Sequence, residues 1–225
     1  MTPWHPAPSS RAVRIASIAL ALLLGLAFAA AYFTRQTDLF SLLPPDGAAP
    51  DFSAAQRQDL HRTFFTIWAA LVLAAPALAF FVVRRESALL GSLWRAFWTA
   101  SLLAFAVHFY WAVVVMFGND WSRILHTSRV SAPRLDTVFA VWWCVDVALA
   151  WLYKGEPLWV RVQRWLVHAL AFLLFFMGAA REGELLASRV LGWSFAAVVV
   201  AAFGWKLWMR RAQARARGQA PQPAR

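Results

Sequence analysis

The chain has 225 residues, of which 61% are hydrophobic and only 15% are charged. Soluble globular proteins carry about half hydrophobic and about a quarter charged residues. This composition excludes a water-soluble enzyme, a disordered chain and a collagen, and the single cysteine excludes a disulfide scaffold. Lys and Arg outnumber Asp and Glu by 22 to 11. The composition predicts a protein whose main surroundings are lipid.

Six segments approach the roughly 20 apolar residues that a membrane-crossing helix needs. In chain order they are residues 15–33, 63–83, 97–117, 137–153, 165–180 and 190–208. The fourth and fifth are short, so we expect them to be thin spans buried in protein. The sequence therefore predicts an all-α integral membrane protein, in which residues 1–209 form one bundle of six transmembrane helices. Residues 210–225, rich in Ala, Gln, Arg and Pro, are predicted to form a disordered polybasic tail.

The first segment has two interpretations. It follows a basic start and contains small residues at Ala29, Ala30 and Ala31, as a cleaved signal peptide does. Its apolar run is long for a signal peptide, which favours an uncleaved span, and the rest of the topology is the same in both cases.

The distribution of basic residues predicts the orientation of the bundle. Cytoplasmic connections retain an excess of Lys and Arg, and the excess is largest when both termini are placed in the cytoplasm of a cell inner membrane. The outer connections then carry acidic and basic residues in balance. We therefore expect the positive charge to meet anionic lipid headgroups and not nucleic acid.

Local signals predict where the connections are structured. Ser53 and Gln56 match a capping box, which predicts that the second helix begins near Ala54. The connection 118–136 is expected to contain a short interfacial helix that is closed by Ser131 and Pro133.

Asp146 is the first candidate for a functional residue. It lies near the middle of the fourth span, where a charged and unpaired carboxylate costs several kcal/mol. Such an acid must be protonated, paired or in contact with a wet cavity, and it often marks a proton or substrate path. The alternative is a structural hydrogen bond between two helices.

Two histidines lie near Asp146 in depth. At about 1.5 Å of rise per residue, His108 comes within roughly 4 Å of Asp146 along the membrane normal, and His168 within roughly 5 Å. Asp146, His108 and His168 are therefore the candidate intramembrane polar site. The alternative is that each imidazole is satisfied by a nearby carbonyl or hydroxyl group.

Cofactors are not favoured by the sequence. A b-type haem held by His108 and His168 would need both rings at one depth, and the same arithmetic separates them by about 8 Å. On the outer face, Asp59, His61 and His126 are weak metal-ligand candidates, because no H-x-x-x-H or H-E-x-x-H spacing is present.

Three classes of function remain. The first is a small transporter or permease-like component that uses the Asp146 site. The second is a membrane-embedded enzyme or redox subunit acting on a lipid-soluble substrate, and the third is a non-catalytic accessory subunit that assembles with a membrane-protein partner. The deeper tryptophans favour packing, or a cavity for an apolar or isoprenoid-like ligand; they are Trp68, Trp111, Trp142, Trp143 and Trp151.

Overall fold

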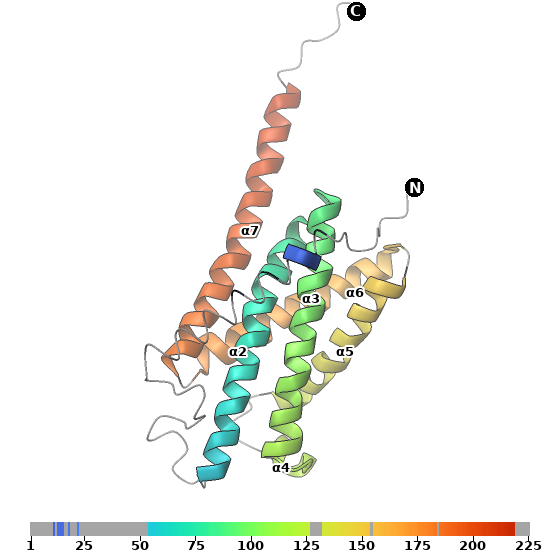
Figure 1. Ribbon diagram of the computed structural model, residues 1–225. Coiled ribbons are helices and arrows are strands. Elements are labelled where there is room, and N and C mark those ends of the chain that lie inside the picture. Colours follow the sequence, from blue (N-terminus) through green and yellow to red (C-terminus); the bar gives the residue numbers. More distant parts are fainter. Residues whose placement is uncertain are drawn as a thin grey trace, which may run out of the picture.

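The computed structural model describes residues 11, 13–15, 18, 22, 54–126, 132–153, 155–183 and 185–218, with the backbone alone at 54–59, 61, 62 and 216–218. The elements are α2 (Ala54–Val83), α3 (Ala88–Phe109), the π-helix η1 (Tyr110–Met116), α4 (Trp121–His126), α5 (Pro133–Leu152), α6 (Leu158–Phe176), the π-helix η2 (Met177–Arg181) and α7 (Leu186–Gly218). Figure 1 shows them as a bundle beyond which the last helix projects.

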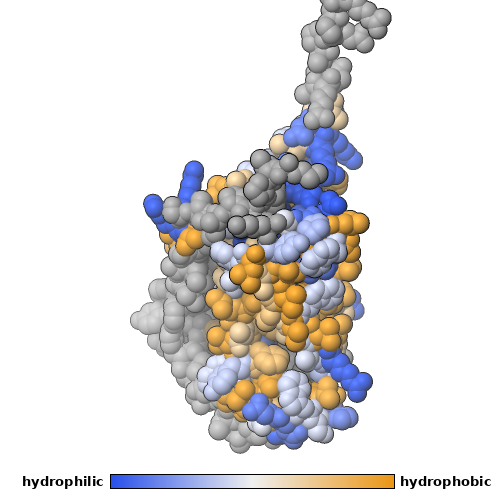
Figure 2. Space-filling view, turned by 90° about the vertical axis from the view of Figure 1, so that its right-hand side faces the viewer, coloured by the Kyte–Doolittle hydropathy of each residue, from blue (hydrophilic) through white to orange (hydrophobic). Residues whose placement is uncertain are grey.

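Five helical segments among the described residues are long and apolar enough to cross a bilayer. They are Thr63–Val83, Ala88–Met116, Pro133–Leu152, Leu158–Arg181 and Leu186–Arg215. Figure 2 shows a band of hydrophobic residues between hydrophilic residues at both ends of the bundle. The prediction of an α-helical, multi-pass membrane protein is confirmed. The predicted first span, residues 15–33, lies almost entirely outside the described residues.

The two spans that the sequence analysis expected to be short are of ordinary length. The fourth runs over 20 residues and the fifth over 24, so neither is a short span. Sequence hydropathy placed the start of the fifth span at Trp165, because the polar residues Gln163 and Arg164 precede it. The structure includes both residues in α6 and buries Arg164 completely.

Other boundaries were predicted with mixed success. Helix α2 begins at Ala54, as the capping pattern predicted, and α4 is the expected short helix of the third connection. Pro133 does not close that helix; it begins α5, because proline suits a first helical turn whose N–H groups have no intrahelical partner. Helix α7 continues to Gly218, so the described part of the predicted tail, residues 210–218, is helical, consistent with its high content of the strong helix formers Ala, Arg and Gln.

The bundle is organised around α2, which packs against α3 and α7, while α5 packs against α6 and α3. Close approach of α2 and α3 is possible because Ala70, Ala74 and Ala77 are fully buried, and Ser101 Oγ donates a hydrogen bond to Ala70 O at 2.7 Å. We call the end that holds the α2–α3 and α5–α6 connections the Arg84 end. The opposite end, which holds α4 and the η2–α7 connection, is the α4 end (Figure 1).

Candidate functional site

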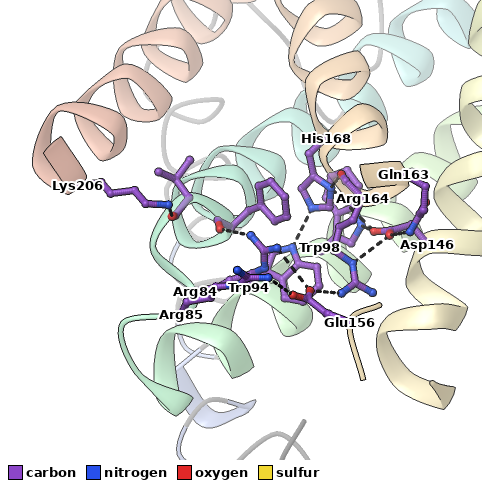
Figure 3. Close-up of polar contacts among 12 residues, drawn as sticks. Arg84, Arg85, Trp94, Trp98, Asp146, Glu156, Gln163, Arg164, His168 and Lys206 are labelled. Atoms are coloured by element: carbon purple, nitrogen blue, oxygen red, sulfur yellow. Dashed lines mark hydrogen bonds and ion pairs between the residues drawn. The ribbon is translucent and has the colours of Figure 1, made fainter. Parts of the chain in front are cut away.

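Asp146 lies on α5 and is fully buried. Its carboxylate accepts hydrogen bonds from Gln163 Nε2 at 2.7 Å, from Trp98 Nε1 at 3.0 Å and from Arg164 Nε at 3.2 Å (Figure 3). The partner that neutralises the acid is therefore Arg164 of α6. The group is held in place by α3, α5 and α6 together.

A second acid extends this group towards the Arg84 end. Glu156, in the α5–α6 connection, accepts from Arg164 Nη1 at 2.5 Å, from Arg85 Nη2 at 2.7 Å and from Arg84 Nη2 at 3.4 Å. Burial alone would raise the pKa of Glu156, but the charges of Arg84 and Arg164 and the hydrogen bonds from Arg85 and Arg164 lower it to about 2. Glu156 is therefore ionised at neutral pH.

We call these six residues the charge network: Arg84, Arg85, Asp146, Glu156, Gln163 and Arg164. Burial lowers the pKa of Arg84 to about 10, so its guanidinium still carries a charge at neutral pH. The Arg84 guanidinium lies 3.9 Å from the centroid of the Phe81 ring, and that of Arg164 lies 4.8 Å from a Trp94 ring, close enough for cation–π attraction. The network thus joins the α2–α3 connection, the α5–α6 connection and α6.

His168 is buried beside the charge network but is not part of an acid–base pair. Its Nδ1 donates to Arg164 O at 2.7 Å, and its Nε2 accepts from Trp94 Nε1 at 2.9 Å. The ring stacks between Phe81 and Trp98, with centroid distances of 3.8 and 4.1 Å. The separation of 3.9 Å between Nδ1 and Asp146 Oδ2 is too long for a hydrogen bond.

The structure brings Asp146 and His168 together but leaves His108 elsewhere. His108 Nδ1 lies 3.0 Å from Thr63 O, near the start of the α2 span, and the ring lines a cavity at the α4 end. A haem held by His108 and His168 does not fit, because both nitrogens of His168 are already bonded and the two rings contact different parts of the bundle.

The cavity at the α4 end has a volume of about 340 Å³. Its wall is mostly apolar and comes from α2, α3, η1, α4, α5, α6, η2 and α7; representative residues are Leu60, Phe64, Ile67, Phe105, Val113 and Phe175. Both π-helical segments contribute to the wall. Among the described residues, the titratable groups on it are His108, Asp136 and Glu182. The arrangement can hold an apolar molecule that carries a small polar group.

The remaining candidates are placed as follows. His126 is exposed, and its Nδ1 lies 2.7 Å from Ser122 O, while the side chains of Asp59 and His61 lie outside the described residues. In the part of the chain that the structure describes, no three His, Cys, Asp or Glu residues gather as metal ligands. Of the five deeper tryptophans, Trp68 alone lines this cavity.

Sequence reasoning missed the partners of Asp146. Gln163, Arg164 and Glu156 were assigned to a cytoplasmic connection, although Arg164 and His168 are spaced i, i+4 and therefore share one face of α6. One signal could have identified the ion pair. Arg164 shares a helix face with His168, and both lie at the same end of the bundle as Asp146.

A comparison with known protein families, curated proteins and solved structures finds no match to this chain.

Proposed function

We propose that this multi-pass membrane protein binds an amphipathic, lipid-soluble small molecule in the cavity at the α4 end. The observation that carries the proposal is a mostly apolar, partly open cavity of about 340 Å³ lined by helices of membrane-spanning length. Pockets for small ligands are typically about 300–1,000 Å³, with mostly apolar walls and a few polar groups. A lipid-soluble substrate belongs to the second of the three classes of function that the sequence left open.

The two π-helical segments support this assignment. π-Helical turns are rare and are found frequently at functional sites. Here η1 places Ala112, Val113 and Met116 on the cavity wall, and η2 places Met177, Gly178 and Ala179 there. Two irregular helical turns on the wall of the same cavity are more than regular packing requires.

In this proposal the charge network has a structural role. Asp146 and Arg164 are both fully buried and bonded to each other, and neither lines the cavity. A transporter that protonates Asp146 would have to separate this pair in each cycle, at a cost of several kcal/mol. We therefore assign ligand binding to the α4 end and the holding of α3, α5 and α6 to the Arg84 end.

We further propose that the Arg84 end faces the cytoplasm of a cell inner membrane, with residues 15–33 as a sixth span and both termini inside. Basic residues on α7 beyond the bundle favour this orientation, because cytoplasmic segments retain cations that attract anionic headgroups; they are Arg210, Arg211 and Arg215. Reporter fusions after Val83 and after Gly118 test it: the first should report cytoplasm and the second the outer side.

A pair of matched substitutions tests ligand binding. The full chain in zwitterionic nanodiscs is incubated with radiolabelled dodecylamine, dodecanol or dodecanoic acid, and counts from empty nanodiscs are subtracted. We expect saturable binding of at least one probe, which Ala112→Phe abolishes because Ala112 lines the cavity. Ala106→Phe, on the exposed surface of α3, is the control and should bind as the native chain does. Absence of saturable binding for all three probes would refute the proposal.

A further inference from the structure

Three hydrogen-bond donors on the cavity wall are used within the protein. Thr63 Oγ1 donates to Leu60 O at 2.6 Å, and Thr137 Oγ1 donates to Pro133 O at 2.8 Å. Trp68 Nε1 donates to Ser188 Oγ at 2.8 Å. These groups therefore offer few free donors to a ligand.

Three further polar groups of the wall, on His108, Asp136 and Glu182, are acceptors, whereas the Trp121 indole is a donor. His108 Nδ1 faces the carbonyl of Thr63, which can only accept, so Nδ1 carries the proton and Nε2 of the neutral ring is left as an acceptor. When ionised, the carboxylates of Asp136 and Glu182 carry acceptors only. Neither carboxylate has a hydrogen bond or ion pair with another described residue, and the described wall contains no Lys or Arg. The cavity thus combines negative charge with an excess of acceptors.

From this charge complementarity we infer that the lipid-soluble ligand carries a protonated amine, which lies among Asp136, Glu182 and His108 while its apolar body lies against η1 and η2. The inference rests on the proposed function, because it names the chemical class of the same ligand. An ammonium group supplies donors to all three acceptors and offsets their charge. A carboxylate or phosphate head would place an anion beside two others, with no Lys or Arg on the described part of the wall to separate them.

The three dodecyl probes separate this inference from the proposed function, because they share one apolar body and differ in the head. We expect dodecylamine to bind at least tenfold more tightly than dodecanol, and dodecanoic acid not to bind saturably at pH 7. Asp136→Asn and Glu182→Gln should each weaken dodecylamine binding about tenfold, because each removes a charge-assisted bond. The same variants should leave dodecanol binding within about twofold of the native value.

The matched control is Glu86→Gln, which neutralises an exposed acid at the Arg84 end and should leave the binding of every probe unchanged. Dodecanol binding by the Asp136 and Glu182 variants also shows that they are folded. Two results would overturn the amine assignment and leave ligand binding intact. One is that dodecanoic acid binds as tightly as dodecylamine, and the other is that neither substitution changes dodecylamine binding. Failure of every probe would refute the proposed function itself.

Discussion

Arg164→Gln is expected to destabilise the protein more than any substitution of an exposed arginine. The change removes the bond from Nε to Asp146 at 3.2 Å, the bond from Nη1 to Glu156 and the cation over the Trp94 ring, and it leaves two acids in a buried site. Removing one partner of a buried ion pair costs about 3–5 kcal/mol. A hydrogen bond between membrane helices averages about 0.6 kcal/mol. The two magnitudes are far enough apart to distinguish an ion pair from interhelical hydrogen bonding alone.

The measurement is the free energy of unfolding, obtained by adding SDS to mixed lipid–detergent micelles and following helix content. Arg161→Gln is the control, because Arg161 is on the same helix and has no side-chain partner among the residues that the structure describes. The double variant Arg164→Gln with Asp146→Asn should recover part of the loss, since the buried charge is removed, with a coupling energy of about 0.5–3 kcal/mol. A loss below about 1 kcal/mol for Arg164→Gln, equal to that of Arg161→Gln, would refute the reasoning.

Two further predictions concern α7 and Glu156. In Gly192→Ala the added Cβ would lie 2.5 Å from a backbone nitrogen of η2, so we expect a loss of about 1–3 kcal/mol in the same unfolding assay, together with weaker probe binding. Gly204→Ala, which meets open space, should be neutral or stabilising by up to about 1 kcal/mol, and an equal loss in both variants would contradict the close contact. The pKa of Glu156 falls from 4.5 to about 2 on folding, so its stabilisation is complete above pH 4.5 and is lost as the pH falls towards 2. The difference in unfolding free energy between the native chain and Glu156→Gln should therefore shrink between pH 6 and pH 3, and a constant difference would contradict the ion pairs.

Hydrophobic runs identified the helices because bilayer thickness fixes their length, but they did not locate the ends. Arg164 was excluded from its span as a charged residue, whereas the structure keeps it inside because Asp146 and Glu156 compensate its charge. The same compensation explains why hydropathy made the fifth span too short. The fourth span gains its extra residues at the other end of the bundle, because Pro133 begins α5.

Depth along the membrane was only partly predictable. Rise per residue placed His108 and His168 near Asp146 in depth, and His168 does lie beside it. Asp146 instead bonds to Trp98, ten residues before His108 on α3, so His108 lies nearer the α4 end than predicted. The cavity was not predictable either, because it arises where helices fail to fill space. Trp68 and His108 line it, but the sequence favoured core packing for Trp68 and grouped His108 with Asp146.

The π-helical segments and the charge network lie at opposite ends of the bundle. We therefore expect the two ends to differ in how freely their helices can rotate. A π turn holds one residue more than an α turn, so converting either segment to α geometry would rotate the residues beyond it by about 100°. Ion pairs and indole bonds fix α3 and α6 at the Arg84 end, which confines such a rotation to the last turns around the cavity. We therefore expect the Arg84 end of the bundle to be rigid and the α4 end to adjust when the cavity takes up a ligand.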